Sequence, residues 1–322
     1  MAIEKKNRIL DIFYRAIRGE KIRVMSLAGE YEVSEKSISR DIAEIKNFLA
    51  DSPDQFAGAE LVYDYTDKAY RLEFDHFLLS KELFSVVKML IGCRGFSKEE
   101  LLELVEKLRQ FTTVEDRILL NQLIQNELYH YQEVRHDCIS VIDNLWKLTG
   151  CINDQKEITI RYNKMNREQV ERRVQPVAVM FSEYYYYLIA FRTDLEEKLP
   201  LYFRIDRIVQ IVEHRTTFVK ENWHSFNEGE LRKQIQFMRP GELRRIRFEF
   251  SGPSVQAILD KIPTAKVVAK NGKTHIIEAE TYGKGINMFL LSQGRCVKAL
   301  SPEIFVQEMR SEIEKMLKNY AE

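Results

Sequence analysis

The sequence has little or none of several features that mark particular classes of protein. Its 49 Lys and Arg balance its 49 Asp and Glu, so the formal net charge is zero. Any nucleic-acid site must therefore be a local patch, because the surface as a whole carries no excess of positive charge. The cysteines are few and scattered, at Cys93, Cys138, Cys151 and Cys296, without a CxxC pair. This spacing speaks against a zinc site or dithiol redox chemistry and favours buried thiols.

Long apolar runs are also missing. No uncharged stretch approaches the roughly 20 residues that cross a bilayer. The first residues, MAIEKKNRILDIF, lack the apolar core of a signal peptide. We therefore expect a cytoplasmic protein with no membrane partner.

Catalytic motifs are missing as well. The sequence has no GxSxG, HExxH or P-loop motif, and no carboxylate cluster that stands apart from ordinary surface charge. Carboxylates that are distant in sequence can still meet in space, so missing motifs do not exclude catalysis. We nevertheless expect that the protein is not an enzyme and that it has no catalytic residues, metal site or cofactor.

The chain does have the length and the apolar content for two or three domains, with 322 residues of which 45% are hydrophobic. Near the N-terminus, apolar residues recur at helical spacing between residues 4 and 18, and a second short helix fits VMSLAGEY. After a tight turn, the segment EKSISRDIAEIKNFLA places Ile38, Ile42, Ile45 and Leu49 on one stripe. We predict an amphipathic third helix here, with Ser34 as its N-cap.

Small polar and basic residues occupy the opposite side of this third helix. Helix, helix, turn and helix, followed by a hairpin such as AELVYDYTDKAYRLEF, are typical of a winged helix-turn-helix, whose last helix enters the major groove of DNA. We assign residues 1–76 to such a DNA-binding domain. The candidate DNA contacts are Lys36, Ser37, Ser39 and Arg40 in the third helix, and Lys68 and Arg71, on phosphate, in the hairpin.

The charge of this region argues the other way. Residues 1–75 hold 12 Lys and Arg against 15 Asp and Glu, a net of −3. DNA affinity would then have to come from a few well-placed contacts and from the pairing of two such domains in a dimer. The outward face of the third helix would also suit the solvated side of an ordinary helical bundle.

Residues 77–150 show helical periodicity without a catalytic constellation. SKEE, at residues 97–100, predicts a capping box, and further helices fit TVEDRILLNQLIQNEL and HDCISVIDNLWKLTG. We expect a helical connector that links domains or pairs subunits.

After Gly150 the period changes to two. Five short strands fit EITIRY, RRVQPVAVMF, YYYYLIAF, LPLYFRI and RIVQIVEH, which favours a small barrel or sandwich in residues 151–222. Both faces of the tyrosine-rich strand are apolar, so alternation does not tell which face lines the core. Arginines lie close to these tyrosines in sequence. Together they would suit phosphate binding and base stacking, or equally cross-strand pairs and dimer contacts.

The last third reads strand, helix, strand, strand, helix, strand, followed by a final helix. Asn271 and Gly272 predict a hairpin turn, and Ser301 and Pro302 predict the N-cap and the first residue of the final helix. This order fits a ferredoxin-like α+β domain in residues 240–322.

With these elements placed, the chain resembles the WYL-domain transcriptional regulators of bacteria. The matching residues are SEKSISRDI in the third helix, ITIRY and RRVQP in the first strands, and YYL (Tyr186, Tyr187, Leu188) in place of Trp-Tyr-Leu. They continue with YFRIDRI and with LLSQGRCVKALSPEIF near the C-terminus. The resemblance implies a multidomain α+β protein: winged helix-turn-helix, helical connector, Sm-like or SH3-like WYL barrel, and a C-terminal WCX extension.

The resemblance also implies a dimer whose WYL domain senses a nucleic acid, a nucleotide or another anionic effector. The residues on the matching motifs become the effector-site candidates: Tyr162, Arg173, Tyr186, Tyr187, Arg192, Arg204 and Arg207. Arg207, beside Asp206, could instead form a structural ion pair.

Two hypotheses follow. The first is a ligand-responsive regulator that reads double-stranded DNA as a dimer. The second is a nucleic-acid or nucleotide binding module whose N-terminal domain mediates protein contacts, in keeping with its acidic balance.

Overall fold

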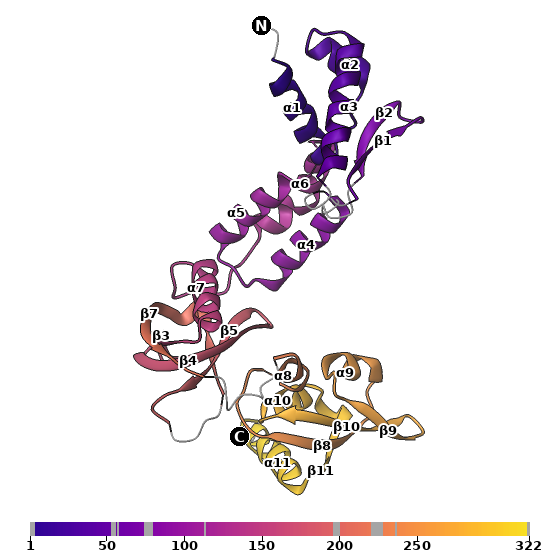
Figure 1. Ribbon diagram of the computed structural model, residues 1–322. Coiled ribbons are helices and arrows are strands. Elements are labelled where there is room, and N and C mark those ends of the chain that lie inside the picture. Colours follow the sequence, from indigo (N-terminus) through magenta and orange to yellow (C-terminus); the bar gives the residue numbers. More distant parts are fainter. Residues whose placement is uncertain are drawn as a thin grey trace. The chain divides into compact units, whose positions relative to one another are not determined.

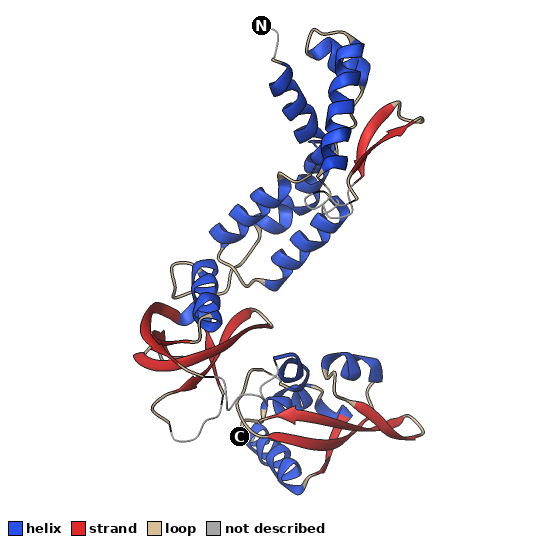
Figure 2. Cartoon of the chain, in the orientation of Figure 1, coloured by secondary structure: helices blue, strands red, loops and turns tan. Residues whose placement is uncertain are grey.

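The computed structural model describes residues 4–52, 56, 58–73, 80–112, 114–195, 200–219, 228–235 and 237–320 (Figures 1 and 2). The fold is mixed α+β, with helices and three separate β-sheets in these described residues. The chain divides into two compact units, Met1–Glu133 and Val134–Glu322. Among the described helices, none is both long enough and apolar enough to cross a membrane.

The first unit opens with three helices and a two-stranded antiparallel hairpin, in the predicted order (Figure 1). These elements are α1 (Lys5–Ile17), α2 (Val24–Glu30), α3 (Glu35–Asp51), β1 (Glu60–Asp64) and β2 (Ala69–Glu73). The Ser34 side chain accepts a hydrogen bond from the Ser37 N–H at 3.2 Å, which confirms the predicted N-cap of α3. Glu32, in the turn before α3, has a φ of 54°.

One apolar core joins these three helices to the hairpin. The four residues of the predicted stripe on α3 are all buried in it, and α1, α2, β1 and the residues close to α2, Ile22 and Tyr31, supply its other buried members. A buried ion pair adds to this packing, since Arg8 Nε of α1 lies 2.6 Å from Asp41 Oδ2 of α3. Ile22 also forms a β-bridge with Tyr70 of the hairpin. The orientation of α3 is therefore fixed from the side that faces the core.

Three further helices follow in the first unit: α4 (Ser80–Cys93), α5 (Lys98–Arg109) and α6 (Val114–Tyr129). Each contacts the other two. Ser97 and Glu100 form the predicted capping box at the start of α5. The Tyr131 hydroxyl donates to the Phe96 carbonyl at 2.8 Å and ties the end of this region to the loop before α5.

The second unit starts with α7 (Val141–Asn153), which packs on a five-stranded antiparallel sheet. The sheet elements are β3 (Lys156–Asn163), β4 (Gln169–Ser182), β5 (Tyr185–Arg192), β6 (Leu201–Arg204), the 3₁₀ helix η1 (Ile205–Arg207) and β7 (Ile208–Thr217). The strand order is β6-β5-β4-β3-β7. Leu148 and Cys151 of α7 enter the core of this sheet. The last predicted helix of the connector thus covers the sheet.

The prediction that the cysteine thiols are buried is only partly confirmed. Cys151 is buried, and its surroundings raise the pKa of its thiol above the ordinary value. Cys93, Cys138 and Cys296 are also free but remain partly exposed.

The remainder of the second unit is a four-stranded antiparallel sheet with helices. Its elements are α8 (Glu228–Gln234), β8 (Leu243–Phe250), α9 (Val255–Lys261), β9 (Lys266–Asn271), β10 (Thr274–Tyr282), α10 (Gly285–Ser292), η3 (Gly294–Cys296), β11 (Val297–Ser301) and α11 (Glu303–Lys318). The strand order is β11-β8-β10-β9, and Phe248 and Phe305 are fully buried in the core.

The predicted start of the final helix was wrong by one residue. Ser301 pairs with Arg247 as the last residue of β11, so its backbone belongs to the sheet. Pro302 takes the cap position of α11, and no side chain caps the helix there.

Candidate functional site

The outward face of α3 carries two cations without local partners. Lys36 and Arg40 are exposed, and neither forms an ion pair within the described part of the chain. The predicted serines differ from them, because both hydroxyls are already bonded: Ser37 Oγ lies 2.9 Å from Ser34 Oγ, and Ser39 Oγ donates to the Glu35 carbonyl at 2.9 Å. The ammonium and guanidinium groups are thus the side chains of this face that are most available to an incoming phosphate or base.

The two predicted hairpin contacts differ in the same way. Lys68 is exposed at the turn, with a φ of 48°, and has no ion pair among the described residues. Arg71 instead pairs with Asp67, and Asp67 also binds Lys21 Nζ at 2.8 Å. The hydrogen bond from Lys21, helped by Arg71, lowers the pKa of the Asp67 carboxyl. Arg71 is therefore held in a small ionic network.

Sequence reasoning missed an aromatic side chain at this turn. Tyr65 is 85% exposed between β1 and β2, with the Tyr63 ring 5.1 Å away. Its place in the predicted turn YDYTDK was the available signal, since a turn residue has no core to enter.

The structure separates the two faces of β5. One face enters the core of the five-stranded sheet with Tyr186, Leu188 and Ala190. The other enters a second apolar cluster, which contains Tyr187, Ile189 and Phe191 together with Leu231 of α8 and Ile235, the residue after α8. Tyr186 and Tyr187, which were predicted to share one effector site, thus lie on opposite faces. Tyr187 lies at the start of this second face and is only partly buried.

Arg204 lies beside this partly buried start of the second face. It is directly opposite Tyr187 on the neighbouring strand, and its guanidinium carbon is 3.4 Å from the centre of the Tyr185 ring. Asp206 of η1 holds the guanidinium at two points, Nε to Oδ1 at 3.1 Å and Nη2 to Oδ2 at 2.5 Å. The side chains of Arg204 and Asp206 are only 17% and 4% exposed. Tyr185, absent from the predicted residues, is the aromatic neighbour of this arginine.

Burial and pairing act in opposite directions on the titration of this site. Burial by itself would lower the pKa of Arg204, but the hydrogen bonds and charge of Asp206 outweigh it and the pKa is raised. Burial also raises the pKa of the Tyr187 hydroxyl. At neutral pH the site therefore holds a cationic guanidinium and a protonated phenol.

The other predicted arginines do not join Arg204. Arg173 Nη2 pairs with Glu157 of β3 at 2.7 Å, on the far side of β4 from β5 and β6. Arg192 pairs with Asp194 at two points, 2.8 and 2.5 Å; this hydrogen bonding raises the pKa of Arg192 and lowers that of Asp194. Each of these cations thus has its own carboxylate.

Two predicted effector residues remain. Tyr162 belongs to the core side of the sheet, where its ring meets Phe203 edge-on at 5.5 Å. Arg207 is half-buried in η1 and forms no ion pair among the described residues. The carboxylate of Asp206 pairs with Arg204, so the alternative of an ion pair between Arg207 and Asp206 was wrong.

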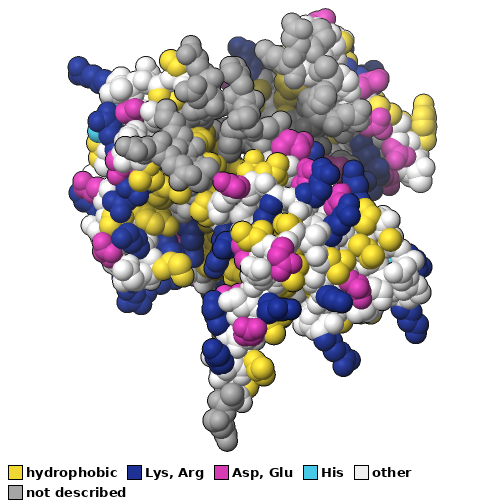
Figure 3. Space-filling view, turned by 90° about the horizontal axis from the view of Figure 1, so that it is seen from below, with side chains coloured by type: hydrophobic (Ala, Val, Ile, Leu, Met, Phe, Trp, Pro, Cys, Tyr) yellow, Lys and Arg dark blue, Asp and Glu magenta, His cyan; other side chains and the backbone are white. Residues whose placement is uncertain are grey.

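The geometry at Arg204 suits a flat, anionic ligand. The bonds to Asp206 use Nε and Nη2, which leaves the N–H groups of Nη1 for another acceptor. Arginine binds phosphate well, and tyrosine rings stack on bases. Within the described residues, no group of His, Cys, Asp and Glu could hold a metal ion. The surface drawn in Figure 3 mixes basic, acidic and hydrophobic side chains.

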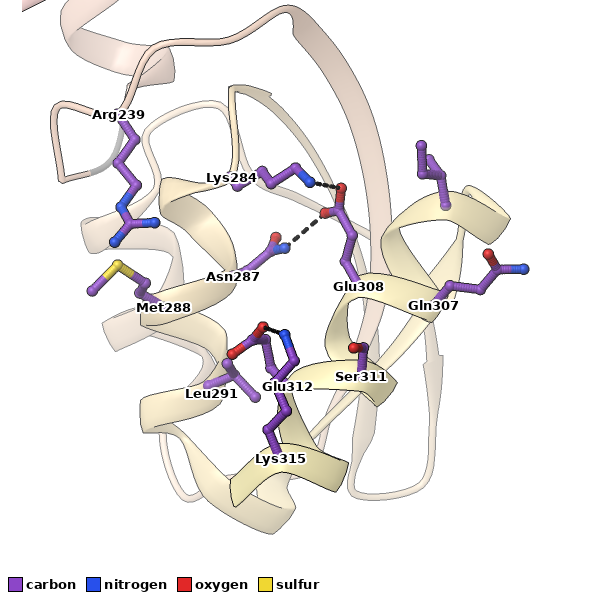
Figure 4. A pocket seen from close by; sticks show the side chains of 11 residues that line it. Arg239, Lys284, Asn287, Met288, Leu291, Gln307, Glu308, Ser311, Glu312 and Lys315 are labelled. Atoms are coloured by element: carbon purple, nitrogen blue, oxygen red, sulfur yellow. Dashed lines mark hydrogen bonds and ion pairs between the residues drawn. The ribbon is translucent and has the colours of Figure 1, made fainter. Parts of the chain in front are cut away.

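A pocket of about 640 Å³ lies elsewhere, between α10 and α11 (Figure 4). Glu308 is a charged residue of its lining. It binds Lys284 at 3.0 Å and accepts hydrogen bonds from Asn287 and Arg244, each at 2.8 Å. Burial by itself would raise the pKa of Glu308, but these donors hold it below its ordinary value. The central charges of this pocket therefore satisfy one another, and it is a weaker candidate for an anion site than Arg204.

Comparisons with known proteins find a match within the second unit. Residues 143–213 match the family described as WYL domain. No curated protein matches the sequence. Among solved structures, the chain is similar to proteasome accessory factor B/C (PafBC) of Arthrobacter aurescens, with 16% identity and a TM-score of 0.30 over 99% of this chain and 49% of that chain. It is also similar to a CRISPR Cas-related protein, with 14% identity and a TM-score of 0.38 over 98% of this chain and 83% of that one.

The chain spans about half the length of the PafBC chain. Both TM-scores are low, so these two likenesses are remote. The family match is more local: it runs from α7 into β7 and includes β3, β4, β5 and β6. The part of this chain that matches the WYL domain is therefore the five-stranded sheet together with the helix that covers it.

Proposed function

We propose that the protein is a ligand-responsive transcription regulator that binds double-stranded DNA as a homodimer in the cytoplasm. The WYL domain senses a nucleic acid, a nucleotide or another anionic effector. The protein is not an enzyme and uses no cofactor. On this proposal, residues 1–76 are the winged helix-turn-helix, 77–150 the helical connector, 151–222 the WYL barrel and 240–322 the ferredoxin-like WCX domain.

The outward face of α3 is the observation that carries the proposal. Its inward stripe is buried and Arg8 anchors it to α1, so its direction is set by the core. Lys36 and Arg40 stand on the other side, exposed and without ion pairs in the described residues. A helix that is fixed on one side and cationic on the other suits the major groove.

The winged-helix assignment gains support from the hairpin after α3. The order α1, α2, α3, β1, β2 and the bridge between Ile22 and Tyr70 fit a wing beside the reading helix. Strand order supports the C-terminal assignment, because β11-β8-β10-β9 corresponds to 4-1-3-2 in the numbering of a four-stranded βαββαβ domain.

The direct test is a gel-shift titration and footprint on the DNA upstream of the gene for this protein. We expect a footprint with two related half-sites. Arg40→Ala should weaken binding about tenfold, since a cation that contacts a base is worth about 1–3 kcal/mol. Lys81→Ala, which removes an exposed cation from α4, is the matched control and should bind normally. Unchanged binding by Arg40→Ala would show that α3 is not the reading helix.

The alternative is a nucleic-acid or nucleotide binding module whose N-terminal domain contacts proteins. The ionic network of Lys21, Asp67 and Arg71 favours it, because it removes a cation from the wing that DNA would use. The discriminating measurement uses the complete chain with duplex and single-stranded oligonucleotides. Binding of single strands that is lost in Arg204→Gln, with no duplex binding at any sequence tested, would support the alternative.

A further inference from the structure

The segment that joins the two compact units is tied to one short stretch of the sheet. Residues 134–140, here named the junction segment, follow Glu133, the last residue of the first unit. The N–H groups of Asp137 and Cys138 both donate to the Asp206 carbonyl, at 2.8 and 3.0 Å. The first residues of the second unit are therefore hydrogen-bonded to the main chain of η1.

The helix after the junction segment is held by the same stretch. The Asn144 side chain donates to the Ile208 carbonyl at 2.9 Å, and Lys147 Nζ donates to the Ile211 carbonyl at 2.8 Å. Carbonyls from η1 and the start of β7 thus hold the junction segment and α7 in register. A tilt of η1 would change the hydrogen bonds between the Asp206 carbonyl and the junction segment.

Asp206 has two roles in this arrangement. Its main-chain carbonyl holds the junction segment, and its carboxylate holds Arg204 of the candidate effector site. The carboxylate is nearly buried, so it depends on Arg204 for the charge that offsets its lost hydration. A buried carboxylate left without its partner must reach water or be protonated.

From this geometry we infer that Asp206 is a relay between the effector site and the junction segment. An anion that takes the Arg204 guanidinium competes with the Asp206 carboxylate. The released carboxylate turns toward water, η1 moves with it, and the Asp206 carbonyl loses its hold on the junction segment. The relay rests on the proposed function for its biological role, but its structural claim can be tested without DNA or an effector.

Amide hydrogen exchange of the full chain, read by mass spectrometry, tests the relay. Arg204→Gln leaves the buried Asp206 carboxylate without its partner. We expect amides in peptides that cover residues 134–140 to exchange about tenfold faster, because the unpaired buried charge favours local opening at η1. Exchange in β3 should stay unchanged. Unchanged exchange in the junction segment would overturn the relay, as would an equal rise in β3, which would mean that the ion pair only holds the sheet together.

A second ion pair in the same sheet provides the control. Arg192 and Asp194 have the same spacing in sequence and the same two-point contact, but Asp194 is 57% exposed. Arg192→Gln should leave exchange in the junction segment at the wild-type rate. A rise equal to that of Arg204→Gln would contradict the relay.

A rescue variant separates the relay from general damage to the fold. Adding Asp206→Asn to Arg204→Gln removes the stranded charge and keeps the main-chain carbonyl. We expect this double variant to recover slow exchange in residues 134–140. Exchange as fast as in Arg204→Gln would show that the carboxylate is not the cause and would overturn the relay. A failure of DNA binding would leave all these outcomes unaffected, so the two proposals fail separately.

Discussion

The cations of α3 and those of the five-stranded sheet have opposite surroundings. Lys36 and Arg40 are exposed and have no ion pairs among the described residues, whereas Arg173, Arg192 and Arg204 each hold a carboxylate. A phosphate can approach α3 without breaking an existing bond. An anion that takes the Nε and Nη2 donors of Arg204 must displace the Asp206 carboxylate. The first arrangement suits constant binding to a polyanion, and the second suits conditional binding to a ligand that outcompetes the protein itself.

The largest expected effect concerns the most buried of these ion pairs. Arg204→Gln should lower the free energy of unfolding of the second unit by about 3 kcal/mol, because it leaves a buried carboxylate without its partner. Urea denaturation of the complete chain, followed by circular dichroism, measures the change. A loss as small as that of an exposed ion pair would remove the contrast between the sheet and α3.

The hairpin of β1 and β2 offers a smaller test of the same contrast between paired and unpaired cations. Lys68 is free of ion pairs in the described residues, while Arg71 is paired with Asp67. Lys68→Ala should weaken DNA binding and reduce the slope of log affinity against log salt by about 1, the amount expected for one lost phosphate contact. Arg71→Ala should change that slope less. Affinity titrations across a series of salt concentrations compare the two, and a larger change for Arg71→Ala would break the comparison.

Replacing Arg192 should have little effect on stability. Asp194, the partner of Arg192, is largely exposed, and ion pairs in solvent add little to stability. Arg192→Gln should therefore unfold at the same urea concentration as the wild type at neutral pH. A clear loss of stability would mean that exposure does not separate this ion pair from Arg204 and Asp206.

The smallest effect is the pH dependence of that ion pair. Its hydrogen bonds lower the pKa of Asp194 in the folded protein below that of the unfolded chain. The small stabilisation from this pair is therefore fully present at a pH above the ordinary aspartate pKa of about 3.9. It is lost as the pH falls through the lowered pKa of Asp194 in the folded protein. Any difference between wild type and Arg192→Gln should disappear in acid. Thermal unfolding across a pH series checks this, and a difference that grows in acid would have the wrong sign.

The elements with one apolar face could be predicted well. The stripe of α3, its Ser34 cap and the capping box at Ser97 depend on neighbours in sequence, and all three are present. Mixed α+β architecture and the match to the WYL domain also agree with the sequence-based expectation. These features are local or repeat with a fixed period, so a single sequence contains them.

The arrangement of the candidate effector site could not be predicted in the same way. Alternation puts Tyr186 and Tyr187 on opposite faces of β5, but both faces are apolar, so the sequence did not tell which face lines the core of the sheet. The choice of Arg204 over Arg207 as partner of Asp206 depends on the turn of η1, which no residue pattern specified. Tyr185 was missed because its role comes from a cross-strand neighbour. Contacts between strands need the register, and register is a property of the folded sheet.

The buried ion pair between Arg8 and Asp41 helps to hold α3 in the fold. The helix therefore has two kinds of residue: those that hold it in place and those that can be replaced. Asp41 and the apolar stripe must be kept, because they hold the helix in place. Lys36, Ser39 and Arg40 are exposed, and the Ser39 hydroxyl donates to the Glu35 carbonyl rather than to Asp41 or the stripe. On the proposed function, substitutions at these positions should change the DNA sequence that the protein prefers and leave the fold intact.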